Sequence, residues 1–272
     1  MSRSLSVLTA DGTRLNARID GPDAAPWVVF SNSVLTDLSV WEDQVAALAG
    51  RYRILRYDQR GHGASDVTAR PLDFTAYGDD LVAVLAAAGA ERAVLVGLSM
   101  GCPSALAAAA AAPERLAAFV AVDGVTKSAP GREAFWAAQR EMARGEGMEA
   151  LALATAARWL PGVAADDPRA RRLRRMIAAT PAEGFAAATH ALAAYDQTPA
   201  APLTCPVLAI AGERDGAMPE TMRAQFGAFP DARITVIPGA GHLPNLQSPD
   251  AFNTTLVGFL DAHAFLNDKE TA

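Results

Sequence analysis

The chain has 272 residues, of which 51% are hydrophobic and 20% are charged, with 24 basic and 30 acidic side chains. A chain of this length buries a full core without disulfides or structural metal. The formal net charge of −6 offers no attraction for nucleic acid or for an anionic membrane, so we expect a soluble globular protein that acts on small molecules.

Short β-like runs alternate first with turns and then with helical stretches through the first half of the chain. The first two runs flank an Asp11-Gly12 turn and predict a hairpin. The later apolar runs do not alternate with polar residues, which is typical of parallel strands covered on both faces by helices. The predicted strands are Leu5–Thr9, Leu15–Ile19, Trp27–Phe30, Arg53–Tyr57, Ala93–Val96 and Leu116–Val122, and the predicted helices are Trp41–Leu48, Tyr77–Ala88 and Pro103–Ala111.

Between residues 127 and 199 the strand signal disappears, and helical segments separated by Gly and Pro replace it, which predicts an inserted helical cap. The alternation then resumes with strands Val207–Ala211 and Arg233–Ile237, helices Pro219–Phe229 and Pro249–Ala264, and a polar tail. The predicted fold class is therefore α/β, with a doubly wound, mainly parallel, eight-stranded sheet. Residues 1–126 and 200–272 would form the core, and 127–199 the cap.

The strongest motif is Gly97-Leu98-Ser99-Met100-Gly101, which lies between a predicted strand and a predicted helix. In that context G-x-S-x-G makes a sharp turn that exposes the serine hydroxyl at the positive end of the helix. Glycine is expected at 97 and 101 because a Cβ atom there would collide with neighbouring backbone. The alternative is an ordinary turn serine, but the flanking elements favour Ser99 as a nucleophile.

A serine hydroxyl is a weak nucleophile and needs a base. Of the four histidines, His62 lies in a Gly-rich turn, His190 in the predicted cap and His263 in the last predicted helix, where structural or surface roles are typical. His242 follows the last strand, at the edge where ligands and catalytic groups collect on parallel sheets. We therefore predict that His242 is the base.

The base needs an acid that orients it, and two residues compete for that role. Asp215 follows the strand that precedes the His242 strand, and the order Ser, Asp, His favours it. Asp123 follows the strand that leads into the cap and is also typical of a turn. We predict Asp215 as the orienting acid and keep Asp123 as the alternative.

The oxyanion of a tetrahedral intermediate needs two backbone N–H donors. We expect one from Met100 and one from Val34, in the loop that follows the strand Trp27–Phe30. The sequence contains no H-E-x-x-H, no G-x-x-x-x-G-K-[ST] and no G-x-G-x-x-G, so we expect no metal, no other cofactor and no bound nucleotide.

The cysteines and the N-terminus indicate a reducing compartment. Cys102 and Cys205 form no C-x-x-C pair, and the N-terminal residues lack the apolar stretch of a signal peptide. The alanine tracts at 83–90 and 105–112 are too short, or too interrupted by charge, to span a bilayer. We expect a cytoplasmic protein that does not bind membranes.

The motifs Asp58-x-Arg-Gly-x-Gly-x-Ser65, Gly97 to Gly101, Gly-x-x-Asp215 and Gly-His242 occur in the order that the α/β-hydrolase superfamily shows, and the chain resembles that superfamily over nearly its whole length. The segments Ser31-Asn-Ser33, Thr36-Asp-Leu38 with Trp41, Arg56-Tyr-Asp58 and His242-Leu-x-Asn245 are similar to those of 3-oxoadipate enol-lactonases. The resemblance implies an α/β-hydrolase fold with the three catalytic groups named above.

Three departures from that resemblance concern the elbow, the oxyanion loop and the cap. Cys102-Pro103 replaces the glycine that usually follows the turn Gly97 to Gly101, which we call the elbow. Val34-Leu35 replaces a Leu-Gly pair. Gln139 stands where the resemblance implies a cap arginine for the substrate carboxylate. Arg140, or the arginines at 171, 172, 174 and 175, are the alternatives for that contact, and Trp136 and Trp159 are predicted to wall the substrate pocket.

The resemblance implies a serine hydrolase that cleaves a carboxylic ester or lactone through an acyl-enzyme, most specifically 3-oxoadipate enol-lactone in aromatic-acid catabolism. A generic carboxylesterase and a cofactor-free perhydrolase or oxygenase of the same fold are alternatives. A small-molecule receptor on a hydrolase scaffold is another, but the complete set Ser99, Asp215 and His242 counts against it. The expected partner is a small lactone or ester, and the sequence leaves open whether the chain forms a homo-oligomer.

Overall fold

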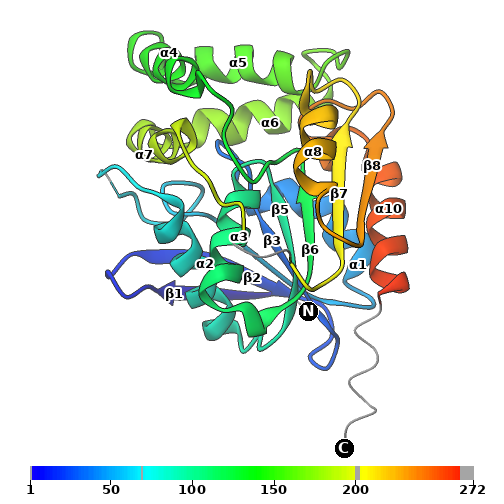
Figure 1. The fold of residues 1–272 in the computed structure, drawn as a ribbon. Coiled ribbons are helices and arrows are strands. Elements are labelled where there is room, and N and C mark those ends of the chain that lie inside the picture. The colour runs from blue at the N-terminus through cyan, green and yellow to red at the C-terminus, as the bar shows by residue number, and fades with distance from the viewer. Residues whose placement is uncertain (1, 69, 200–202, 264–272) are drawn as a thin grey trace, which may run out of the picture.

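A single eight-stranded sheet forms the centre of the protein in the computed structural model, which describes residues 2–68, 70–199 and 203–263 (Figure 1). The strand order is β1-β2-β4-β3-β5-β6-β7-β8. β2 pairs antiparallel with β1 and β4, and all other pairs are parallel. The strands are β1 Arg3–Leu8, β2 Arg14–Asp20, β3 Trp27–Ser31, β4 Arg53–Tyr57, β5 Ala93–Leu98, β6 Leu116–Val122, β7 Val207–Gly212 and β8 Ala232–Ile237. The predicted eight-stranded, mainly parallel sheet is confirmed.

Helices cover both faces of the sheet, as continuous apolar strands require. One face packs on α1 Glu42–Leu48 and α10 Pro249–Ala262, and the other on α2 Phe74–Ala88, α3 Gly101–Ala111 and α8 Met218–Phe226 (Figure 1). Successive β5 residues alternate between the two cores, because Val94 and Val96 belong to the first and Leu95 to the second. No helix within the described residues is long and apolar enough to cross a membrane.

Several helix ends differ from those predicted. α2 begins at Phe74 rather than Tyr77, because the Asp73 side chain caps it by accepting from the Ala76 amide at 3.1 Å. Two short 3₁₀ helices, η1 Leu38–Trp41 and η2 Pro113–Arg115, and the four-residue α9 Pro244–Gln247 were not predicted. α8 ends at Phe226 rather than Phe229. Ala264 of the last predicted helix and the polar tail lie outside the described residues.

The four cap helices lie between β6 and β7 and are stacked over the carboxyl edge of the sheet (Figure 1). α4 packs on α5 and α7, and α5 packs on α6. The segment is closed at its base, where Lys127 and Asp196 form an antiparallel bridge and a salt bridge of 2.7 Å. We use the name cap for these helices, which are α4 Arg132–Gly145, α5 Gly147–Trp159, α6 Pro168–Ala179 and α7 Ala182–Ala193.

The carboxyl edge gathers residues that are far apart in sequence. Ser99 follows β5, Asp123 follows β6, Asp215 comes shortly after β7, and His242 comes shortly after β8. Because β5, β6, β7 and β8 are neighbours in that order and run parallel, their following loops meet at one edge of the sheet.

The Asp58-to-Ser65 motif holds the hairpin end of the molecule together through a buried arginine. Arg60 Nη2 and Nε each lie 2.6 Å from an oxygen of Asp80 on α2, and Nη1 lies 2.8 Å from Asp11. The side chains of Arg60 and Asp80 are only 3% and 2% exposed. This pair ties the loop after β4 to α2.

Arg60→Met is expected to destabilise the fold by about 3–5 kcal/mol, because it leaves the Asp80 carboxylate buried without a cation. The free energy of unfolding in urea measures the loss. Arg70→Met is the matched control: Arg70 also contacts Asp11, at 3.3 Å, but its side chain is 60% exposed, so the loss should stay within about 1 kcal/mol. Equal losses in the two variants would contradict the assignment.

Candidate active site

Ser99 lies on the tight turn between β5 and α3. Its backbone φ of 53° is in the left-handed region, which costs a non-glycine residue on the order of 1–3 kcal/mol. A Cβ atom at Gly97 would lie 2.4 Å from the Gly101 carbonyl oxygen, and one at Gly101 would lie 2.1 Å from that of Ser31. The crowding predicted at both glycines is confirmed. The Ser99 amide donates to the Val122 carbonyl at 2.8 Å and so fastens the turn to β6.

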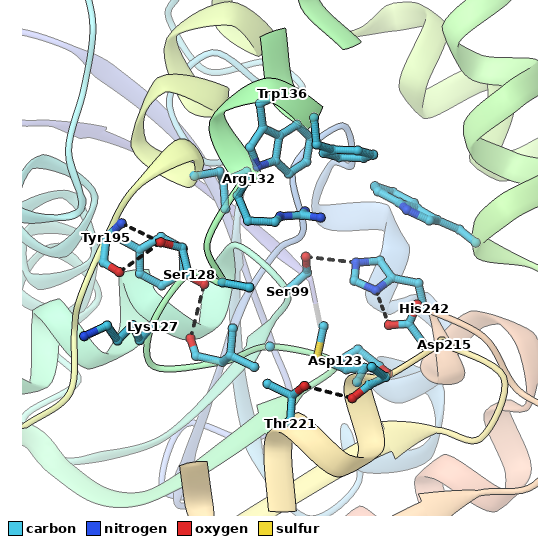
Figure 2. A pocket seen from close by; sticks show the side chains of 18 of the residues that line it. Ser99, Asp123, Lys127, Ser128, Arg132, Trp136, Tyr195, Asp215, Thr221 and His242 are labelled. Atoms are coloured by element: carbon cyan, nitrogen blue, oxygen red, sulfur yellow. Dashed lines mark hydrogen bonds and ion pairs between the residues drawn. The ribbon is translucent and has the colours of Figure 1, made fainter. Parts of the chain in front are cut away.

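The structure brings together the three side chains predicted as nucleophile, base and acid. His242 Nε2 lies 2.9 Å from Ser99 Oγ, and His242 Nδ1 lies 2.7 Å from Asp215 Oδ2 (Figure 2). Burial opposes ionisation of Asp215, but the adjacent imidazole and its hydrogen bond hold the pKa of Asp215 below its usual range. An ionised carboxylate only accepts hydrogen bonds, so Nδ1 donates to Asp215 and Nε2 is left to accept from the Ser99 hydroxyl.

The cap holds the His242 loop in place. The His242 amide donates to the Trp159 carbonyl at 3.0 Å, and the two rings pack with their centroids 4.9 Å apart. Trp159 is the last residue of α5. The position of the imidazole therefore depends on the cap as well as on the sheet.

Asp123, the alternative acid, lies behind Asp215. Its side chain is completely buried, and its two oxygens accept from the Gly212 amide at 2.9 and 3.2 Å. Burial, reinforced by the negative charge of Asp215, raises the pKa of Asp123 well above its usual range. Asp215, rather than Asp123, occupies the position that orients the imidazole.

A cavity of about 360 Å³ opens beside Ser99 and His242. Trp136 and Trp159 line it, as predicted, together with Leu192 of α7 and several other cap and core residues. This volume and apolar wall are typical of a site for a small organic ligand.

Two arginines that the sequence analysis did not single out line the same cavity. Arg132 begins α4 and Arg158 lies near the end of α5. The Arg132 guanidinium carbon lies 4.3 Å from the centre of the Phe135 ring and 5.1 Å from that of Trp136, and Figure 2 shows the group above Ser99. Within the described residues, neither arginine forms a salt bridge with an acidic side chain.

Burial lowers the pKa of both Arg132 and Arg158 from the ordinary arginine value. Both cations are therefore partly withdrawn from water without a directly paired counter-ion among the described residues, although Arg158 remains the more exposed of the two. An anionic group on a ligand would supply that counter-ion next to the reacting serine.

The cavity does not reach two residues that were predicted to contact substrate. Gln139 and Arg140 lie one turn further along α4 and are absent from the lining of this cavity, because only the N-terminal end of that helix borders it. Arg140 instead pairs with Glu133 at 3.0 Å and donates to Thr189 at 3.4 Å. The structure therefore gives no contact between this cavity and either position, and the α6 arginines at 171–175 lie outside it too.

The two amides predicted to hold the oxyanion lie in suitable loops. Met100 directly precedes α3, and Val34 lies in the loop after β3; in the described structure neither amide donates to a protein acceptor. Asn32 braces the loop by accepting from Trp41 Nε1 at 2.8 Å. Leu35 has a φ of 65°, a conformation that favours glycine, which agrees with the Leu-Gly pair that the resemblance implies there. The role of the two amides stays a prediction.

Comparison with known proteins places this geometry among hydrolases. The chain is 33% identical over 264 residues to 3-oxoadipate enol-lactonase 1 of Acinetobacter baylyi, covering 94% of this chain and 97% of that protein. It is 29% identical to a 2-(acetamidomethylene)succinate hydrolase of Mesorhizobium japonicum, covering 91% of this chain and 92% of the relative. The crystal structure of the enol-lactonase from Burkholderia xenovorans superposes with a TM-score of 0.86 at 35% identity, covering 95% of this chain and 100% of the other.

Residues 25–255 match the model of the alpha/beta hydrolase family. That span runs from β3 to α10 and contains the elbow, the cap and both loops that carry the acid and the imidazole. The chain belongs to the alpha/beta hydrolase family.

Proposed function

We propose that the protein hydrolyses a lactone that carries a carboxylate, most specifically 3-oxoadipate enol-lactone in the catabolism of aromatic acids. The observation that carries the proposal is the Arg132 guanidinium, which forms no salt bridge within the part of the chain that the structure describes and lies above a hydrogen-bonded serine, imidazole and carboxylate. The similarity to enol-lactonases from Acinetobacter and Burkholderia supports it. The cytoplasmic location and the small-molecule partner remain predictions from the sequence.

In the proposed reaction His242 takes the Ser99 proton as Oγ attacks the lactone carbonyl, and Asp215 stabilises the imidazolium that forms. The Val34 and Met100 amides hold the oxyanion. The ring opens as the carbonyl carbon–oxygen bond breaks. The leaving group is an enolate, which is stabler than an alkoxide, and it takes the proton from the imidazolium, so His242 is neutral again. Water, activated by the same imidazole, then releases the acid product from Ser99.

Arg132→Gln is expected to lower kcat/KM for the enol lactone by roughly 10- to 100-fold, because a charged hydrogen bond to the substrate is lost. A neutral ester of similar size should lose much less. Steady-state kinetics on both substrates measure the difference. Arg171→Gln removes one positive charge from an exposed position of the cap outside the cavity, so it controls for net charge and should leave both values near wild type.

The same experiment separates the proposal from a generic carboxylesterase. Equal losses on the neutral ester and the anionic lactone, or no loss on either, would contradict carboxylate recognition by Arg132. In that case the enol-lactone assignment falls and only serine-dependent ester hydrolysis remains.

A further inference from the structure

Two carboxyl groups lie side by side beneath the imidazole, and only one of them has a role in the proposed reaction. One oxygen each of Asp123 and Asp215 and one ring nitrogen of His242 all lie within 4.8 Å of one another. Asp123 is completely buried, and Gly212 is its only N–H donor within the described residues. A buried carboxylate with one donor, facing a second carboxylate, is poorly compensated as an anion.

Two negative charges this close together in a buried site repel each other strongly, which favours a proton on one of the two carboxyl groups. Asp215 faces His242 Nδ1 at 2.7 Å, which favours the charge on Asp215. We propose that Asp123 is held as a neutral carboxylic acid that donates its proton to Asp215, and that it is thereby a positioning residue for the catalytic carboxylate. The raised pKa of Asp123 and the lowered pKa of Asp215 agree with this division of charge.

The neighbouring charged groups also favour a negative charge on Asp215 rather than on Asp123. The cations that act on Asp215 are Arg132 from α4 and Arg158 from α5. The His242 ring, from the loop after β8, donates a hydrogen bond to the same carboxylate. From α3, Cys102 packs against Gly124, and burial raises the pKa of its thiol, so it brings no charge. α8 contributes Thr221 and Met218 to the adjoining cavity, and neither side chain titrates.

The backbone fixes Asp123 for this role. Its φ is 38°, a left-handed conformation that Asp and Asn tolerate better than most residues, and its amide donates to the Ile210 carbonyl at 2.9 Å. Asparagine fits the same conformation and offers an N–H donor and a carbonyl acceptor in place of the acid. Asp123→Asn therefore imitates a neutral Asp123, whereas Asp123→Ala removes the donor.

Infrared spectroscopy of the full chain, with carbon-13-labelled aspartate, tests the protonation without any substrate. We expect a carboxylic acid band that persists at pH 7 to 8 in the wild-type protein and in Ser99→Ala, and that is missing in Asp123→Asn. A wild-type spectrum without that band, or a band that survives in Asp123→Asn, would overturn the inference. This readout is independent of the proposed function, because it holds whether or not the enol lactone is the substrate.

The pH dependence of kcat/KM tests the positioning role, with phenyl acetate as the probe. Without the donor, the negative charge of Asp215 concentrates on the oxygen that faces the imidazole and stabilises the imidazolium. Asp123→Ala should therefore move the acid limb, which is the fall of kcat/KM at low pH, to higher pH by about half a unit or more. Asp123→Asn should restore the limb to its wild-type position. Equal thermal midpoints of the two variants would show that folding does not cause the difference.

An ionised Asp123 would give the opposite sign. Both substitutions would then remove a negative charge beside the imidazole and move the acid limb to lower pH. That result, or activity that falls on dialysis against a chelator and returns with zinc, would overturn the shared proton. A failure of Ser99→Ala to lose activity would instead refute the proposed function and leave the infrared result standing.

Discussion

Ser99→Ala is expected to lower kcat by roughly 10⁴- to 10⁶-fold, the range seen when one member of a cooperating catalytic set is removed. The reason is that no other hydroxyl in the described cavity combines a 2.9 Å contact to the imidazole with a position at the start of a helix. Steady-state hydrolysis, together with covalent labelling by a fluorophosphonate, measures the loss. Both signals should disappear in the same variant.

Ser99→Gly separates the lost nucleophile from the strain of the turn. Glycine adopts the φ of 53° at this position freely, so this variant should be as inactive as Ser99→Ala but more stable by about 1 kcal/mol. Thermal unfolding compares the two. Persistence of turnover in either variant would show that the reaction does not pass through an acyl group on Ser99.

The sheet and the serine turn were predictable because their signals are local. An unbroken apolar strand is followed by glycines two residues before and two residues after Ser99, and then by a helix. The crowding at Gly97 and Gly101 shows why few other residues fit there. Parallel topology then brings the residues after β5 to β8 to one edge without any further information. The pairing of Ser99, His242 and Asp215 followed from chain order and topology.

The substrate contacts were not predictable in the same way. Arg132, Phe135 and Trp136 share one face of α4 by their spacing, so the sequence contained a signal for an arginine beside the predicted pocket tryptophan. Which turn of the helix borders the cavity depends on how the cap sits on the core, and that is a long-range property. Arg132 was therefore not singled out, whereas Gln139 and Arg140, which lie about two turns further along α4, were predicted instead.

The relation between the two acids was also out of reach, because Asp123 and Asp215 both follow parallel strands at the same edge. Chain order ranked them but did not show that an oxygen of each lies within 4.8 Å of the other. The structure indicates that they act as a pair, one oriented on the imidazole and one behind it. Treating Asp123 and Asp215 as alternatives for one role left no place for a joint role of the two carboxyl groups.

Asp215→Asn is expected to lower kcat/KM by roughly 10⁴-fold, mainly because it imposes the wrong tautomer on His242. If Asp123 is a neutral donor, its proton bonds the new amide oxygen, and the amide NH₂ then faces Nδ1. Nδ1 is forced to accept, Nε2 carries the proton, and the imidazole is unable to take the Ser99 proton. Kinetics across pH 6 to 9 should show the loss at every pH, because a change of pH does not convert one tautomer of the neutral imidazole into the other.

The double variant Asp123→Ala with Asp215→Asn tests this chain of hydrogen bonds. Without the Asp123 donor the amide is free to rotate, and its oxygen then accepts from Nδ1 as the carboxylate does in the wild-type protein. Asp123→Ala alone moves the acid limb of the pH profile to higher pH and so lowers kcat/KM at pH values on that limb. At the same pH we expect the double variant to exceed Asp215→Asn by about tenfold, and such a reversal of sign requires direct coupling between the two positions. Additive losses would mean that the two side chains do not share a proton. In that case Asp123 does not hold the amide at position 215 in one orientation, and Asp123→Ala does not free that amide to rotate.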